Sequence, residues 1–195
     1  MKPALRQHIL ACRDAIPALQ RAQAGAAISR RIAQLARFRA AGCVLAYMTM
    51  GSEFDTASLV REVLAAGRVL GLPRVNRALR RLDLYRVMDP DRDLAPGTWG
   101  IREPDPVRCP PLAGERVDLV LVPGVAFDAH RARLGYGGGF YDRLLAASLP
   151  RALRVAAAFS QQIVERVPVE PHDLAMDLVV TEARVYSAGE HGDPE

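Results

Sequence analysis

The sequence predicts a single α/β domain whose mostly parallel sheet carries helices on both faces. Short apolar runs alternate along the chain with longer segments of helical periodicity. The apolar runs are continuous, as they are in parallel strands buried on both faces. The length of 195 residues suits one core. We therefore expect a Rossmann-like three-layer arrangement over residues 1–186 and a disordered polar tail over residues 187–195.

The first part of the chain is expected to be helical. Apolar side chains recur over residues 4–38 at three- and four-residue steps, namely Ile28, Ile32, Leu35 and Phe38. Pro17 disfavours the helical state in the residue before it, so we expect two helices with a break at this point. Asp14 is a candidate cap for the second helix.

Strands and helices then follow in turn. The expected strands are residues 43–49, 69–72, 82–87, 117–122, 155–159 and 178–181. Pro73 is expected to end the second of them. Helices are expected over residues 56–66, with Gly67 as the stop, and over residues 140–147. The run at 117–122 is the most apolar, which predicts a central strand.

Two connections between these elements are long. Residues 89–114 are rich in Pro, Gly and Asp, and we expect a surface connection around Trp99. Loops of this length are uncommon in compact domains unless they have a function. Trp99 therefore either covers a ligand or anchors the loop. The second connection, residues 124–139, is expected to be a loop that leads into the helix at 140–147.

The composition argues against a membrane or secreted protein. No apolar run approaches the roughly 20 residues that cross a bilayer, and the N-terminus lacks the pattern of a signal peptide. The three cysteines, Cys12, Cys43 and Cys109, are far apart, so we expect unpaired thiols and neither a disulfide nor a zinc site. We expect a cytoplasmic protein.

The basic charge does not by itself indicate nucleic-acid binding. The net charge is +4 and the isoelectric point is near 9.3, mostly because of arginine. Aromatic residues are scarce and are not interleaved with the arginines, so stacking platforms for bases are not evident. We expect solvated arginine faces, no nucleic-acid partner and a monomer.

The sharpest motif lies between a predicted strand and a predicted helix. Residues 122–128 are Val-Pro-Gly-Val-Ala-Phe-Asp, and residues 133–143 are Arg-Leu-Gly-Tyr-Gly-Gly-Gly-Phe-Tyr-Asp-Arg. Four glycines in five positions let backbone N–H groups approach an anion, and the helix N-terminus adds its positive dipole end. Arg133 and Arg143 bracket the loop with positive charge. The pattern favours a phosphate-binding loop over a simple turn.

This loop matches neither of two common phosphate motifs. The dinucleotide-binding pattern would need glycine at the position of Phe140, and a P-loop would need a following Gly-Lys-Ser/Thr. In open α/β sheets ligands bind beyond the carboxyl ends of the strands, which is where this loop is expected to lie.

The two runs resemble the signature of the 5-formyltetrahydrofolate cyclo-ligases, also called methenyltetrahydrofolate synthetases. Shorter pieces similar to that family follow in the right order: Lys2-x-x-Leu5-Arg6, Glu53-x-Asp55-Thr56, Leu72-Pro73, Gly100-Ile101-Arg102-Glu103-Pro104, Glu170-x-His172-Asp173 and Thr181-Glu182. The resemblance spans residues 2–182. The central motif is highly specific, whereas each flanking piece is persuasive only through its order.

The resemblance implies a ligase that depends on ATP and Mg²⁺. ATP would phosphorylate the formyl oxygen of 5-formyltetrahydrofolate, N10 would attack the activated carbon, and loss of phosphate would give 5,10-methenyltetrahydrofolate. A formamide carbonyl is a poor electrophile and its oxygen a poor leaving group, and phosphorylation addresses both. Catalysis of such a transfer is mostly positioning and charge neutralisation. The excess positive charge would suit a polyglutamate tail on the folate, which is a hypothesis.

The resemblance also implies roles for individual residues. Contacts to ATP fall on Lys2, Arg6, Arg133, Leu134, Gly135, Tyr136, Gly137, Gly138, Gly139, Phe140 and Tyr141. Contacts to the folate fall on Met48, Glu53, Tyr136, Gly137, Gly138, Gly139 and Phe140. Asp142 and Asp173 match the magnesium carboxylates. Arg133 and Tyr136 would position the substrates, and no acid or base is assigned.

One family position differs here. Many members have tyrosine where this chain has Phe140, so a stacking role remains but a phenol hydroxyl is lost.

Two alternatives remain open. The first is another enzyme on a related scaffold, such as a sugar-phosphate isomerase or a nucleotide-dependent transferase, which would use the anion loop without a Glu53 pocket. The second is a non-catalytic protein that binds RNA or another polyanion, which predicts steep salt dependence. The order of the motifs favours the cyclo-ligase.

Overall fold

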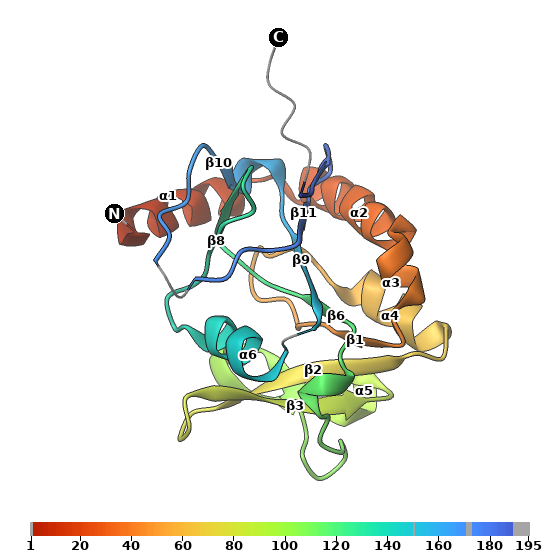
Figure 1. Ribbon diagram of the computed structural model, residues 1–195. Helices are drawn as coiled ribbons and strands as arrows, with labels where there is room; N and C mark the ends of the chain where they lie inside the picture. The colour runs from red at the N-terminus through yellow and green to blue at the C-terminus, as the bar shows by residue number, and fades with distance from the viewer. Residues whose placement is uncertain (1, 150, 171–172, 189–195) are drawn as a thin grey trace.

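A seven-stranded sheet forms the centre of the computed structural model, which describes residues 2–149, 151–170 and 173–188 (Figure 1). Its strands are β1 (Cys43–Leu45), β2 (Val69–Asn76), β3 (Arg81–Val87), β6 (Leu119–Leu121), β9 (Leu153–Ala157), β11 (Leu178–Val180) and β12 (Val185–Tyr186). The spatial order is β12-β11-β9-β6-β1-β2-β3. Neighbours from β11 to β2 pair in parallel, and the two edge strands pair antiparallel. The prediction of a mostly parallel sheet is confirmed.

Helices cover both faces of this sheet (Figure 1). The helices α2 (Ala18–Gln34), α3 (Ala36–Ala40) and α4 (Ala57–Ala65) pack on one face, and α6 (Phe140–Ser148) packs on the other. Side chains alternate along each strand, so Val44 packs with Ile28 and Ile32 while Leu45 packs with Leu144. The strands are buried on both faces, which explains their continuous apolar sequence.

The helix α1 (Lys2–Asp14) lies outside these layers. Its Ile9 packs with Val125, Ala126 and Leu134 in a small third core. That core is built on a second sheet of three short strands, β7 (Ala126–Asp128), β8 (Arg133–Leu134) and β10 (Ile163–Val164). The prediction of a loop throughout 124–139 was therefore wrong, because β7 and β8 form a hairpin. Strands of two or three residues are too short to give a periodic signal.

The long connection at 89–114 also has its own structure. It contains α5 (Pro90–Asp93), the strands β4 (Leu94–Pro96) and β5 (Arg102–Pro104), and the 3₁₀ turns at Thr98–Gly100 and Gly114–Arg116. The strands β4 and β5 pair antiparallel. Trp99 and Gly100 form the turn with φ of 56° and 76°. The expected surface connection thus contains a small hairpin that holds Trp99 at its tip.

Two local predictions were wrong for identifiable reasons. β2 continues through Pro73, because β1 pairs with it only as far as Gly71 and leaves one side of Pro73 without a partner strand. A missing N–H is tolerated at such an edge. Asp14 does not cap α2, which begins after Pro17 without a side-chain cap. Asp14 instead accepts a hydrogen bond from the Ser52 hydroxyl.

Other expectations can be compared directly. Gly67 follows α4 with φ of 68°, as expected for a helix stop. The three cysteines are unpaired. None of the helices in the described ranges has the length and apolarity needed to cross a bilayer. Residues 189–195 of the predicted tail lie outside the described residues.

A buried carboxylate supports the hairpin that leads into the glycine-rich segment. Asp128 accepts hydrogen bonds from the Ala132 and Val167 backbone N–H groups, each at 2.9 Å. Asp128→Ala should leave both N–H groups buried without an acceptor, at about 1–3 kcal/mol each. We expect urea denaturation to show a loss of about 2–4 kcal/mol in unfolding free energy. Asp91→Ala, at an exposed carboxylate, is the control, and equal losses in both variants would contradict this role.

Candidate active site

A cavity of about 460 Å³ opens at the carboxyl ends of β6, β1 and β2. One wall comes from the segment after β1, including Met48 and Glu53, and another from β2, β3 and the hairpin with Trp99. The third wall is the glycine loop, which we define as residues 135–139, together with the start of α6. Its position agrees with the rule that open α/β sheets bind ligands beyond the carboxyl ends of their strands.

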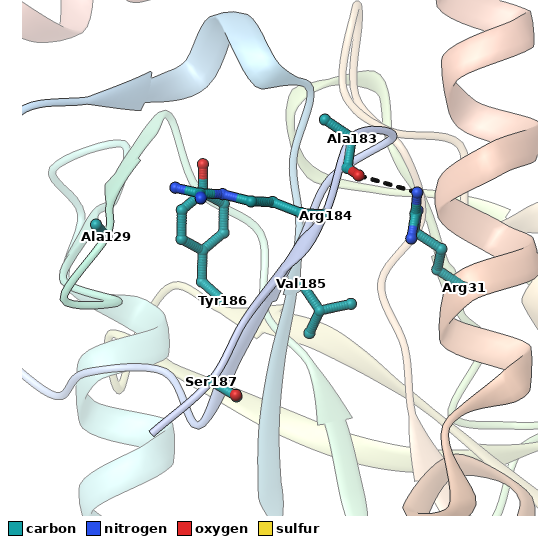
Figure 2. Close-up of a pocket in the computed structure, with 7 residues that line it drawn as sticks. All are labelled: Arg31, Ala129, Ala183, Arg184, Val185, Tyr186 and Ser187. Carbon is teal, nitrogen blue, oxygen red and sulfur yellow. Dashed lines mark hydrogen bonds between the residues drawn. The ribbon is translucent and has the colours of Figure 1, made fainter. Parts of the chain in front are cut away.

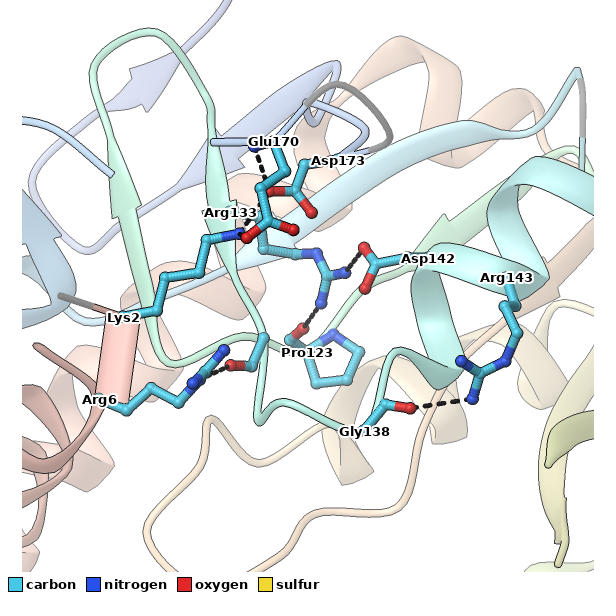
Figure 3. Close-up of polar contacts among 10 residues, drawn as sticks. Lys2, Arg6, Pro123, Arg133, Gly138, Asp142, Arg143, Glu170 and Asp173 are labelled. Carbon is cyan, nitrogen blue, oxygen red and sulfur yellow. Dashed lines mark hydrogen bonds and ion pairs between the residues drawn. The ribbon is translucent and has the colours of Figure 1, made fainter. Parts of the chain in front are cut away.

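Most of the predicted site residues meet in this cavity. It is lined by Met48, Glu53, Arg133, Gly135, Tyr136, Gly137, Gly138, Gly139, Phe140, Tyr141 and Asp142. Leu134 differs, because its side chain is buried in the core with Ile9 and Val125, so only its backbone is available to a ligand. Lys2, Arg6 and Asp173 gather on the outer side of the glycine loop (Figure 3).

Two glycines of the loop are required by their surroundings. A Cβ at Gly135 would lie 2.9 Å from Arg133 Nη1, so a side chain here would displace the guanidinium. Gly139 is the N-cap of α6 with φ of 63°, a conformation that favours glycine. The loop can therefore pass closely over Arg133 and enter α6 directly.

Cations and carboxylates alternate on the outer side of the loop (Figure 3). Lys2 Nζ lies 2.9 Å from Asp173 Oδ2 and 3.1 Å from Glu170 Oε1. The hydrogen bond to Asp173 raises the pKa of the Lys2 ammonium, which stays charged. Arg6 Nε donates to the Gly135 carbonyl at 2.7 Å. The N-terminal helix thus brings two fixed positive charges to the loop.

Arg133 lies beneath the loop and is 7% exposed. Its Nη1 donates to the Pro123 carbonyl at 3.1 Å, and its Nη2 donates to the Asp142 carboxylate. Asp142 comes from the first turn of α6, where the helix dipole favours a negative charge. The guanidinium therefore connects the end of β6 to the start of α6.

The acidic residues fit a magnesium site. The described part of the chain has no group of three or more His, Cys, Asp and Glu side chains arranged for a metal. Mg²⁺ usually takes only one or two carboxylates, keeps several waters and bridges to phosphates. The Asp142 and Asp173 side chains are 27% and 16% exposed, and each already holds a cationic group. Their hard oxygen donors and access to water suit that ion.

Glu53 is one of the buried charged residues that line the cavity, at 8% exposure. Its carboxylate accepts hydrogen bonds from the Tyr136 hydroxyl and, at 2.8 Å, from the Met50 backbone N–H. Burial raises the pKa of Glu53, and these hydrogen bonds together with the Arg13 charge oppose that rise. Burial and the Glu53 charge raise the pKa of Tyr136, so its hydroxyl remains a proton donor.

Sequence reasoning missed Arg13, which is 4% exposed in the last turn of α1. Arg13 Nη1 donates to the Tyr136 hydroxyl at 2.8 Å, and Nε donates to Ser52 Oγ at 2.9 Å. The spacing of the basic residues along α1 could have identified Arg13. At about 100° per residue, Lys2, Arg6 and Arg13 lie within about 40° of one another on the helix. This basic stripe is the face that α1 turns toward the site.

Trp99 covers one edge of the cavity. Its ring lies 5.9 Å from that of Phe140 at an interplanar angle of 76°, an edge-to-face contact. Arg143 lies 5.2 Å from the centre of the Phe140 ring and donates to the Gly138 and Arg80 carbonyls at 2.9 Å. Arg143 therefore holds the backbone of the loop, and Phe140 is fixed as an aromatic wall.

The comparisons with known proteins agree with this arrangement. A model of the 5-formyltetrahydrofolate cyclo-ligase family matches residues 1–182. The chain belongs to that family. A 5-formyltetrahydrofolate cyclo-ligase of Mycolicibacterium smegmatis is 35% identical over 146 residues, covering 72% of this chain and 74% of that protein. The mouse 5-formyltetrahydrofolate cyclo-ligase is 30% identical over 144 residues, covering 70% of this chain and 71% of the relative.

Solved structures lead to the same family. The NMR structure of Aquifex aeolicus 5,10-methenyltetrahydrofolate synthetase has a TM-score of 0.85 and 34% identity, and the match covers 100% of this chain and 96% of that one. A Mycoplasma pneumoniae 5,10-methenyltetrahydrofolate synthetase, at 20% identity and a TM-score of 0.75, shares the fold. Membership of the cyclo-ligase family decides against the isomerase and polyanion-binding alternatives that the sequence left open.

A second cavity of similar size, about 480 Å³, lacks these features (Figure 2). It lies beside β12, where Arg31 of α2 donates to the Ala183 carbonyl at 2.9 Å and Arg184 lies 4.3 Å from the centre of the Tyr186 ring. None of the predicted site residues lines it. Arg31 attaches the β11–β12 turn to α2, so this groove has a structural explanation.

Burial of the ionised Glu53 carboxylate should lower the free energy of unfolding of the protein. Its raised pKa means that the charged form is disfavoured on folding, so its cost is absent below the ordinary pKa of 4.5, grows as pH rises above that value and is complete above the raised pKa of the folded state. Glu53→Gln should therefore be more stable than the parent protein at pH 7 and equally stable near pH 4. Thermal unfolding across this range measures the difference. A variant less stable at pH 7 than at pH 4, relative to the parent, would contradict the assignment.

Proposed function

We propose that this chain binds 5-formyltetrahydrofolate in the cavity and ATP on the outer side of the glycine loop, and produces 5,10-methenyltetrahydrofolate, ADP and phosphate. The observation that carries this proposal is the loop itself. It lies between an aromatic-walled cavity that contains the buried Glu53 carboxylate and a cluster of cations and carboxylates, of which Arg133 and Asp142 also line the cavity. Such a boundary brings a phosphoryl donor and a folate acceptor to opposite sides of one thin backbone segment.

The cavity supports folate binding through shape and hydrogen-bond polarity. Met48, Trp99 and Phe140 provide apolar and aromatic walls for a flat ring system. Glu53 provides acceptor oxygens for the amino and ring N–H groups of the pterin. Each oxygen already accepts one protein hydrogen bond and keeps lone-pair capacity for a ligand. The polar end of the substrate would thus be fixed at Glu53.

The outer side supports a nucleotide. Lys2, Arg6 and Arg133 would neutralise the phosphates, and the backbone N–H groups of residues 135–139 would bind the transferred group. Asp142 and Asp173 would hold Mg²⁺, which when bound neutralises the charge of the ATP phosphates. Their present partners, Arg133 and Lys2, are then freed for the phosphate oxygens. On binding of Mg·ATP the two carboxylates would thus exchange their cationic side chains for Mg²⁺, and the two cations would exchange the carboxylates for phosphate oxygens.

The residues around the loop would act by positioning. The phosphoryl group passes from ATP to the formyl oxygen, N10 attacks the activated carbon, and the carbon–oxygen bond breaks to release phosphate. Arg133, held by the Pro123 carbonyl, provides a positive charge at the point where negative charge develops. The Tyr136 side chain lines the cavity, where its hydroxyl donates to Glu53.

The rim of the cavity also supports the polyglutamate hypothesis. Arg102 lines the cavity and is exposed, with its guanidinium attached to the Pro90 carbonyl at 2.9 Å. A glutamate tail that leaves the cavity on this side would meet this charge.

The activity itself is tested by mixing the purified protein with 5-formyltetrahydrofolate, ATP and Mg²⁺ and following the near-ultraviolet absorbance of the methenyl product. We expect a rise that requires both ATP and metal. No rise with folded protein and authentic substrate would refute the proposed function.

Asp142 is tested by a magnesium titration. Loss of an outer-shell partner typically costs 10–100-fold in metal affinity, so loss of a ligand should cost at least about ten-fold. Asp142→Asn should therefore raise the half-saturating Mg²⁺ concentration by about ten-fold or more while the KM for the folate changes little. Asp105→Asn, at a carboxylate in the connection before β6, is the control. An unchanged magnesium curve would remove Asp142 from the metal site.

A further inference from the structure

Arg13 is a buried cation that none of the roles above explains. It lies at the carboxyl end of α1, about 16 Å along the helix from Lys2 at 1.5 Å per residue. An arginine stays charged in proteins, and a buried charge is costly unless it is hydrogen-bonded and compensated. In the described residues Arg13 forms no ion pair of its own, and its partners are the hydroxyls of Tyr136 and Ser52. Its compensation must come through those two hydroxyls.

Each hydroxyl passes the Arg13 interaction on to a carboxylate. Tyr136 accepts from Arg13 and donates its single proton to Glu53. Ser52 accepts from Arg13 and donates to Asp14. Because a hydroxyl has only one proton, the arginine forces the Tyr136 proton onto Glu53. The guanidinium also lies 5.9 Å from the centre of the Tyr136 ring, which fixes the ring as well as the hydroxyl.

We propose that Arg13 is a positioning residue for the folate. Through the Tyr136 hydroxyl it orients the Glu53 carboxylate for the N–H groups of the pterin. This inference rests on the proposed contact between Glu53 and the folate. It gives α1 two separate tasks, with Lys2 and Arg6 serving ATP at its amino end and Arg13 serving the folate at its carboxyl end.

The charged and titratable groups around Glu53 make the effect specific to Arg13. Glu53 interacts with Arg13 from α1, Tyr136 from the glycine loop, Tyr47 from the segment after β1 and Tyr141 from α6. The pKa values of the three phenols are raised, so all three stay neutral at pH 7. Arg13 is thus the positive charge that favours ionised Glu53, and its removal should raise the pKa of that carboxyl.

The experiment compares Arg13→Met, Arg13→Lys, Tyr136→Phe, Glu53→Gln and the double variant Arg13→Met/Tyr136→Phe. Arg30→Met, at an exposed arginine on α2, is the matched control. Folate binding is measured directly by fluorescence of Trp99, the single tryptophan of the chain, which lines the cavity. The KM values for folate and for ATP, and the pH profile of kcat/KM for folate, are measured at saturating Mg·ATP.

A positioning role predicts a split between the two substrates. Arg13→Met should weaken folate binding about ten-fold or more, as for a hydrogen bond to a charged group, with the KM for ATP within about two-fold of the parent value. The acid limb of the folate profile should move to higher pH in Arg13→Met and stay near its original place in Arg13→Lys, which retains the charge. The double variant should bind folate about as weakly as Tyr136→Phe alone, because both changes break one chain of contacts.

Five outcomes would overturn the proposal. Equal losses for ATP and folate would show that Arg13 only stabilises α1, and so would an unmoved acid limb. Additive losses in the double variant would show that Arg13 does not act through Tyr136. If Glu53→Gln binds folate normally, the premise fails as well, whereas a weakened Glu53→Gln with a normal Arg13→Met rejects the Arg13 step alone. Thermal unfolding of each variant identifies losses that come from misfolding.

Discussion

The buried Arg133 guanidinium is the contact on which the site depends. It binds the Pro123 carbonyl at the end of β6 and the Asp142 carboxylate at the start of α6, and Gly135 has no side chain because this group lies beneath it. A buried arginine with too few partners would be costly, so its partners constrain the backbone on both sides. These contacts of one buried cation constrain the path of the glycine loop.

A thin loop can serve two ligands because its two sides have different chemistry. On the outer side Arg6 binds the Gly135 carbonyl, and ion pairs join Lys2 to Asp173 and Arg133 to Asp142. On the inner side the Tyr136 hydroxyl bonds to Glu53 in an apolar cavity. The Lys2, Asp142 and Asp173 side chains are partly exposed and can exchange partners, whereas Arg133 and Glu53 are buried. Exchangeable, partly exposed charges would suit a flexible polyphosphate, and a buried carboxylate held in place would suit a rigid pterin.

The sequence predicted those parts of the molecule whose signals are local. The parallel strands were predictable because each is buried on both faces, and the strand–glycine loop–helix motif because its residues are contiguous. The β7–β8 and β4–β5 hairpins were missed because strands of two or three residues carry no period. Arg13 was missed because its partner Tyr136 lies 123 positions away, and no local sequence pattern predicts that the two residues are in contact. The side chain of Leu134 belongs to the third core, which exists only once α1 packs on the hairpin.

The phenylalanine at position 140 is consistent with the contacts that surround it in the cavity wall. Phe140 contacts both Trp99 and Arg143, and these contacts use its ring in an edge-to-face and a cation–π interaction. A tyrosine at this position would add a hydroxyl, but Tyr136 and Tyr141 already bring phenol hydroxyls to the cavity. Tyr136 already donates to Glu53. The Tyr141 hydroxyl is buried without a hydrogen-bond partner among the described residues, and its residue lines the same cavity. A buried donor without an acceptor costs about 1–3 kcal/mol, and a ligand that supplies the acceptor would recover that cost on binding.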